Sequence, residues 1–132
     1  MKIKPWRLDC DGLKNYLRIT RNNRSATDMY IDVHNLNTMR RSGDPHTLLD
    51  IRESQEVEVC AVDGSLNIAM SELLNRLDEL PQEHPLVVMC HVGGRSAQVV
   101  QWMRANGFEN ALNLVGGINA WSAEIDPSLP TY

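Results

Sequence analysis

The run Leu86–Met89 restricts the fold of this chain more than any other segment. Its four apolar residues follow Pro85, and the run ends at Cys90. A continuous apolar run of strand length is typical of a central parallel strand, which is buried on both faces of a sheet. Around it, strand signals alternate with helix signals, an order that favours a parallel sheet covered by helices. We therefore predict an α/β fold in which a central, mostly parallel sheet carries helices on both faces.

Element signals begin near Tyr30. Asp32 is suited to cap a helix whose apolar residues recur at helical spacing, and the cluster 42–45 ends that helix. Later helices are expected at 71–80, at 96–106 and around 118–121. The first of these has an apolar stripe, stopped by Pro81, that consists of Leu73, Leu74, Leu77 and Leu80. Strands are expected at Thr47–Ile51, Leu86–Met89, Ala111–Val115 and either Val57–Val62 or Leu66–Ile68.

Size and charge exclude several classes of protein. The 132 residues suit a single domain, and a formal net charge of −4 is unfavourable for a module that must neutralise duplex phosphates. The longest apolar stretch, Leu86–Cys90, has five residues, whereas a membrane span needs about 18 and a signal-peptide core about seven. We expect a soluble, cytoplasmic protein that binds neither nucleic acid nor a membrane.

Charge is distributed unevenly along the chain. Residues 1–27 have a net charge of +5, which leaves −9 on the remainder. This asymmetry predicts a basic N-terminal extension at 1–29 and one domain at 30–132. The extension is interpreted either as a mitochondrial presequence or as an arm that packs on the acidic body. Its two aspartates and single serine favour the arm.

The three cysteines, Cys10, Cys60 and Cys90, suit neither a disulfide framework nor a zinc site, because they are odd in number and lie 50 and 30 residues apart. Free thiols in a reducing compartment are expected, with no metal and no cofactor. Cys60 lies in an apolar stretch and is predicted to belong to the core. Cys10 has a carboxylate on each side that would raise its pKa, so a reactive role is expected for Cys90.

The loop after Cys90 has the composition of an anion cradle. A thiol is nucleophilic as the thiolate, and a helix start after Cys90 would direct unpaired amides and the positive end of a helix dipole at the sulfur. Gly93 and Gly94 let the loop curl without Cβ clashes, and Arg95 adds a positive charge. A tyrosine-phosphatase-like loop is one residue longer between cysteine and arginine. This smaller ring therefore suits a sulfur atom or a small anion better than phosphate.

Segment 90–96, Cys-His-Val-Gly-Gly-Arg-Ser, resembles the active loop of the rhodanese (sulfurtransferase) family, usually written C-x-x-G-x-R-[ST]. Three more segments match that family in order and spacing: 48–53 resembles its LLDVRE strand end, 64–68 its GAxNI turn, and 114–121 its closing LxGGxxAW. Two departures affect local strand geometry and leave the loop intact. Cys60–Val62 replaces the usual GHI, and Ala69 stands where proline is common.

The resemblance, which covers about residues 30–125, implies a sulfurtransferase that moves a sulfane sulfur through a persulfide on Cys90. Arg95 would fix the loop and attract the donor, while Asp50 and Arg52 match positions that brace the active-loop side of the sheet. The implied donor is thiosulfate or a protein persulfide, and the implied acceptor is cyanide, a thiol or a partner protein. The implied substrate-binding residues are His91, Val92, Gly93, Gly94 and Ser96.

Two other functions fit the same residues. One is an arsenate reductase or phosphatase-like thiol enzyme on the same scaffold, and the other is a non-catalytic module whose loop binds a partner. His91 would tune Cys90 or contact the acceptor or, as the better interpretation, lie exposed in the loop. The tail 121–132 resembles the ends of rhodanese domains fused to ubiquitin-activating-like sulfur-carrier enzymes, a hint of protein-to-protein sulfur relay. A monomer or weak homodimer is expected.

Overall fold

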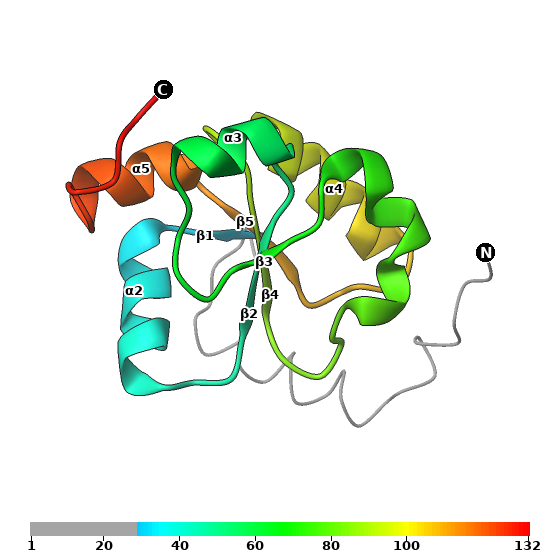
Figure 1. Ribbon diagram of the computed structural model, residues 1–132. Coiled ribbons are helices and arrows are strands. Elements are labelled where there is room, and N and C mark those ends of the chain that lie inside the picture. The colour runs from blue at the N-terminus through cyan, green and yellow to red at the C-terminus, as the bar shows by residue number, and fades with distance from the viewer. Residues whose placement is uncertain (1–28) are drawn as a thin grey trace.

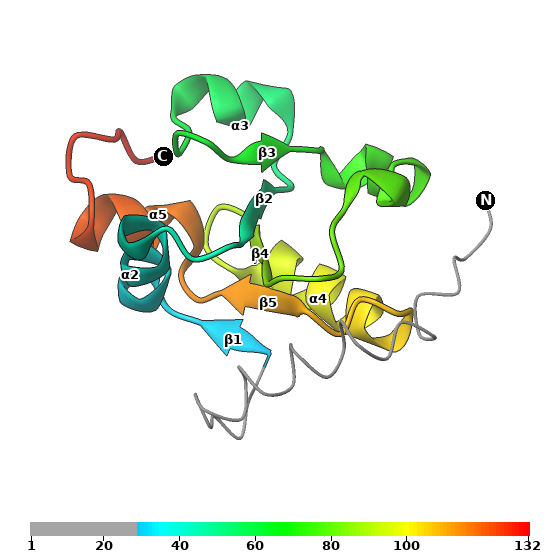
Figure 2. The ribbon, with the colours of Figure 1, turned by 90° about the horizontal axis from the view of Figure 1, so that it is seen from below.

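The computed structural model describes residues 29–132, so the expected extension at 1–29 lies, except for Met29, outside the described residues. Five strands form one sheet in the order β1-β5-β4-β2-β3, in which all neighbours are parallel (Figure 2). Within residues 29–132, no helix combines the length and apolarity needed to cross a membrane. The elements are β1 (Tyr30–Ile31), α2 (Val33–Ser42), β2 (Thr47–Asp50), α3 (Ser54–Val59), β3 (Leu66–Asn67), the 3-10 helices η2 (Met70–Asn75) and η3 (Leu77–Glu79), β4 (Leu86–Met89), α4 (Gly94–Ala105), β5 (Ala111–Leu114) and α5 (Gly117–Glu124).

Strand β4 lies at the centre of the sheet and supplies both hydrophobic cores. Side chains alternate along a strand, so Leu86 and Val88 belong to one core cluster, while Val87 and Met89 belong to the other. The first cluster is covered by α4 and the 3-10 helices, and the second by α2 and α5 (Figure 1). Burial of such a side chain contributes about 1.5–3 kcal/mol. The predicted α/β class, with helices on both faces, is confirmed.

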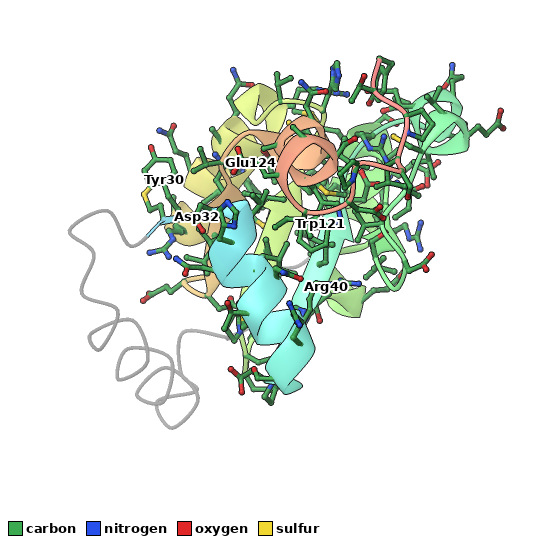
Figure 3. All side chains as sticks on the ribbon, turned by 90° about the vertical axis from the view of Figure 1, so that its left-hand side faces the viewer. Tyr30, Asp32, Arg40, Trp121 and Glu124 are labelled. Carbon is green, nitrogen blue, oxygen red and sulfur yellow. The ribbon has the colours of Figure 1, made fainter. Side chains whose placement is uncertain are left out.

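Helices α2 and α5 pack against each other through side-chain contacts. Asp32 caps α2 by accepting a hydrogen bond from the amide of Asn35 at 2.8 Å, as the sequence predicts. Figure 3 shows Arg40 of α2 beside Trp121 of α5, with the guanidinium carbon 5.6 Å from the ring centroid. His34 of α2 also lies 2.7 Å from Glu124 of α5, so side chains of α2 hold α5, whose first turn follows β5 at the carboxyl edge of the sheet.

Two sequence predictions are corrected by the structure. The alternative strand Val57–Val62 is wrong, because Glu53 and Glu56 form a capping box that starts helix α3; Leu66–Asn67 is the strand instead. The helix expected at 71–80 is replaced by η2 and η3, which are separated by Arg76. Short 3-10 helices do not keep a 3.6-residue period, so Leu74 is 56% exposed and does not belong to the predicted stripe.

Candidate active site

Cys90 lies at the carboxyl edge of the sheet. It directly follows β4, and helix α4 begins at Gly94. In open parallel sheets, ligands bind beyond this edge. We call residues 90–96 the active loop, because they connect the end of the central strand to the first turn of α4.

Main-chain amides of the active loop point at the Cys90 sulfur. The N–H groups of Gly93 and Ser96 donate to Sγ at 3.1 and 3.4 Å. Gly93 has φ 109°, a left-handed conformation, and a Cβ at this position would lie 3.3 Å from the amide nitrogen of Gly116. Glycine is therefore needed for the loop to curl around the sulfur. Cys90 itself is only 1% exposed, so a donor reaches the sulfur only after neighbouring groups move.

The hydrogen bonds determine the ionisation of Cys90. Burial alone raises the pKa of the thiol, because it penalises the charged form. A hydrogen bond from the Ser96 hydroxyl, when it donates to the sulfur, and hydrogen bonds from the amides of Ser96, Gly93 and Arg95 act in the opposite direction and outweigh burial. The pKa of Cys90 therefore lies below its ordinary value, and the thiolate forms at a lower pH than in a free cysteine.

The guanidinium of Arg95 is paired with Glu56 of α3. Its two terminal nitrogens lie 2.9 and 2.8 Å from the two carboxylate oxygens, a bidentate geometry. The hydrogen bond from Arg95 is the largest influence on Glu56 and lowers its pKa to about 2, against the opposing effect of burial. Because its charge is shared with Glu56, Arg95 attracts a donor less strongly than a free guanidinium and ties the start of α4 to α3.

Asp50 and Arg52 form a buried ion pair that contacts α3. Their carboxylate and guanidinium form a 2.7 Å ion pair with both side chains 0% exposed. Arg52 also donates to the main-chain oxygens of Cys60 at 2.8 Å and Glu56 at 3.2 Å. A buried charge needs this degree of pairing to remain ionised. The pair thus joins the end of β2 to the middle and the C-cap of the helix that carries Glu56.

The first turn of α5 holds the backbone of the active loop. The amides of Ile118 and Asn119 donate to the carbonyl oxygens of Cys90 and His91 at 3.0 and 3.1 Å. Gly117 permits this close approach, since a Cβ there would lie 2.5 Å from each of those oxygens. We call residues 115–118 the β5 turn.

Tyr132 covers the His91 side of the active loop. The two rings stack with centroids 3.9 Å apart and planes inclined by 6°. The Tyr132 hydroxyl donates to Glu56 at 2.8 Å and accepts from Arg52 at 3.2 Å. His91 is therefore half-buried, which corrects the expected exposed loop histidine, and its Nε2 is buried without a hydrogen-bond partner among residues 29–132. Val92, the next residue, is 55% exposed.

A second buried contact to the sulfur runs through Ser96 to Asn113 of β5. Ser96 Oγ lies 3.3 Å from the Cys90 sulfur and donates to Asn113 Oδ1 at 2.5 Å. Asn113 Nδ2 in turn donates to the carbonyl oxygen of Gly93 at 3.4 Å. Strand β5 therefore contacts the active loop through a side chain as well as through the β5 turn that follows it.

Comparison with known proteins agrees with this geometry. The profile of the rhodanese-like domain matches residues 32–124. This chain belongs to the rhodanese-like domain family. The maize (Zea mays) protein adenylyltransferase and sulfurtransferase MOCS3-2 is 36% identical over 97 residues, which cover 68% of this rhodanese-like chain and 20% of that protein. The chain thus spans about a fifth of that relative's length.

Solved structures show the same rhodanese fold. A rhodanese-related protein from Thermoplasma volcanium has a TM-score of 0.64 and 30% identity, covering 76% of this chain and 94% of that chain. The human single-domain sulfurtransferase TSTD1 has a TM-score of 0.65 and 26% identity, covering 73% of this chain and 96% of that chain. The fold therefore occurs as a single domain in a protein named a sulfurtransferase.

Some residues of this rhodanese-like site were predicted from the sequence and others were not. The structure brings Cys90 and the amides of Gly93 and Ser96 together, as the spacing predicts, and Gly94 forms the first residue of α4. Sequence reasoning missed Glu56, Asn113 and Tyr132. The capping box and a polar residue within a buried strand were the available signals for Glu56 and Asn113. Among residues 29–132, no group of three or more His, Cys, Asp or Glu side chains is arranged to hold a metal ion.

Proposed function

We propose that this rhodanese-like chain is a sulfurtransferase that carries a sulfane sulfur as a persulfide on Cys90. The observation that carries the proposal is the pair of N–H donors, from Gly93 and Ser96, directed at Sγ. Fixed amides of this kind favour negative charge on sulfur without reorganisation during the reaction. The sulfurtransferase names of similar proteins support the same reaction class.

Loading begins when the Cys90 thiolate attacks the outer sulfur of thiosulfate. A new S–S bond forms at Cys90 as the bond between the sulfane sulfur and the sulfonate breaks, and sulfite leaves with the electron pair. With a protein persulfide as donor, the donor's thiolate leaves instead. The outer sulfur then carries the negative charge, and the loop amides from His91 to Ser96 hold it.

Release of the sulfur breaks the S–S bond that loading formed at Cys90. Cyanide or an acceptor thiolate attacks the outer sulfur, the S–S bond breaks, and the Cys90 thiolate is regenerated. The cycle needs no oxidant or reductant. Arg95 and Glu56 fix the loop through both steps, and Asp50 with Arg52 supports α3. The proposed catalytic unit is residues 30–132, acting in a reducing compartment such as the cytoplasm.

Intact-mass measurement tests the proposal. After incubation with thiosulfate, the protein is expected to gain about one sulfur, roughly 32 Da, and to lose it to cyanide as thiocyanate. Cys90→Ser should gain none, whereas Cys60→Ser, at a buried cysteine in the other core cluster, should still load. Sulfur uptake by Cys90→Ser would contradict the assignment. Hydrolysis of an aryl phosphate without a sulfur adduct would instead favour the phosphatase-like enzyme, and partner binding with neither activity would favour the non-catalytic module.

A further inference from the structure

Three buried polar side chains lie in line beneath the first turn of α4. Cys90 follows β4, Asn113 lies on the adjacent strand β5, and Ser96 of α4 lies between their side chains. The exposures are 1% for Cys90, 5% for Asn113 and 0% for Ser96. Since water does not reach these groups freely, each hydrogen bond must be shared among the three side chains and the loop backbone.

The orientation of the Asn113 amide is determined by Gly93. The carbonyl oxygen of Gly93 can only accept, and it faces Asn113 Nδ2 at 3.4 Å. Turning the amide over would bring two oxygens together. Oδ1 therefore faces Ser96 and requires a donor, which the Ser96 hydroxyl supplies at 2.5 Å.

Ser96 has a single hydroxyl proton, and the hydrogen bond to Asn113 uses it. The oxygen then presents lone pairs to the Cys90 sulfur 3.3 Å away. Lone pairs accept the S–H of a thiol, but they do not stabilise a thiolate. For the hydroxyl to donate to a thiolate it must rotate, which leaves Oδ1 of Asn113 buried without a donor, an unfavourable state.

We propose that Asn113 is a positioning residue that holds the Ser96 hydroxyl away from the Cys90 sulfur and thereby limits stabilisation of the thiolate. The amides of Gly93 and Ser96 still favour the thiolate, so the two influences oppose each other. This inference rests on the proposed function for its consequence. In the persulfide the inner sulfur is neutral, so holding back the thiolate favours the loaded form over premature release.

Other charged and titratable groups also face the active loop. Arg95 and His91 belong to the loop, while α3, the tail and the end of β2 contribute Glu56, Tyr132 and the Asp50–Arg52 pair. The substitutions described next leave all of these in place. A change in the ionisation of Cys90 is therefore assigned to the Ser96–Asn113 contact.

The decisive experiment measures the pH dependence of iodoacetamide alkylation at Cys90 in the full chain, with the site identified by peptide mass. Asn113→Leu frees the Ser96 hydroxyl to donate to the thiolate, so the pKa of Cys90 is expected to fall by about half a unit to one unit. A merely structural role for Asn113 would loosen the amides and raise the pKa. Asn110→Leu is the matched control, because Asn110 is also buried but donates to the carbonyls of Pro81 and His84.

Ser96→Ala provides a second test that keeps the helix intact. Without the hydroxyl, the pKa of Cys90 is expected not to rise, and Asn113→Leu should have no further effect in this background. A rise of half a unit or more in Ser96→Ala, or no fall in Asn113→Leu, overturns the proposal. Sulfur loading of the wild-type chain is scored separately by mass. Absence of loading with the expected pKa pattern rejects the sulfurtransferase and supports the assigned hydroxyl orientation.

Discussion

The active loop and the β5 turn are built alike but use their amides differently. Each follows a parallel strand, and each opens a helix with a left-handed glycine, Gly93 at φ 109° and Gly116 at φ 81°. In the active loop the freed amides reach a sulfur atom. In the β5 turn they reach main-chain carbonyl oxygens of the active loop. The same turn thus forms the proposed reactive site or a structural clamp, according to which atoms lie in front of its N–H groups.

The two turns also differ in how tightly they are packed. A Cβ at Gly117 would lie 2.5 Å from two carbonyl oxygens, whereas a Cβ at Gly93 would approach its nearest atom at 3.3 Å. The proposed chemistry therefore belongs to one turn and the strictest steric requirement to the other. Mutational effects on stability should be largest in the turn that carries no reactive group.

The largest expected effect is that of Gly117→Ala. At φ 60°, and with no room for a Cβ, this change should lower the free energy of unfolding by about 3 kcal/mol. Gly43→Ala is the matched control, because Gly43 has φ 77° with no atom within 4 Å of the added Cβ, and should lose about 1 kcal/mol. Urea denaturation compares them. Equal losses would show that the clamp contact is unimportant.

Gly93→Ala should act less on stability and more on chemistry. The strained φ is expected to lower the free energy of unfolding by about 1–2 kcal/mol and, by moving the amide, to raise the pKa of Cys90. Gly94→Ala has an ordinary φ and open space, so its stability should change by less than about 0.5 kcal/mol. Alkylation profiles and denaturation curves measure both quantities. An unchanged pKa of Cys90 in Gly93→Ala would show that the Gly93 amide does not stabilise the thiolate.

Glu56→Gln tests the ion pair between Arg95 of the active loop and Glu56 of α3. The folded pKa of Glu56, about 2, lies below its unfolded value of about 4.3, so its contribution is present above pH 4.3 and is lost as pH falls toward 2. At pH 7, Glu56→Gln should lower the free energy of unfolding by about 1–2 kcal/mol, and the difference should shrink by pH 3. Denaturation at both pH values checks this. Glu79→Gln, in an exposed pair with Arg76, should show little effect, and matching profiles for the two variants would contradict the account.

The smallest expected effect concerns the tail that covers the active loop. Tyr132→Ala removes the stacked ring and should lower the free energy of unfolding by about 1 kcal/mol while speeding alkylation of Cys90. Tyr132→Phe keeps the stack and loses the hydroxyl bonds, so its alkylation rate should stay near that of the wild type. Equal acceleration in both variants would show that the hydroxyl bonds, and not the ring, restrict access.

Local signals made much of this structure predictable. The run Leu86–Met89, the cap at Asp32 and the loop after Cys90 each act through neighbours in sequence, and each forms the expected element. Val57 and Val59 alternate with glutamate as in a strand, but the capping box of Glu53 and Glu56 makes this segment helical. Propensity patterns lose to such a specific cap over a short segment.

The remaining site residues depend on contacts that no spacing encodes. Arg95 and Glu56 are 39 residues apart, Ser96 and Asn113 are 17 apart, and Tyr132 and Glu56 are 76 apart. Glu56 and Arg95 meet because they follow neighbouring parallel strands, β2 and β4, whose carboxyl ends lie at one edge of the sheet, whereas Tyr132 reaches Glu56 from the tail after α5. The position of Cys90 at the end of a strand and the start of its loop was therefore predictable from sequence, whereas the groups that hold the loop required the fold.

The most direct test of the account is the pKa of Cys90 in the wild-type chain. The rate of iodoacetamide alkylation at Cys90, followed against pH and resolved from Cys10 and Cys60 by peptide mass, reports the thiolate directly. The amides of Gly93 and Ser96 predict an inflection clearly below the roughly 8.5 of a free cysteine. An inflection at or above that value would contradict the view that this loop is built to hold an anionic sulfur.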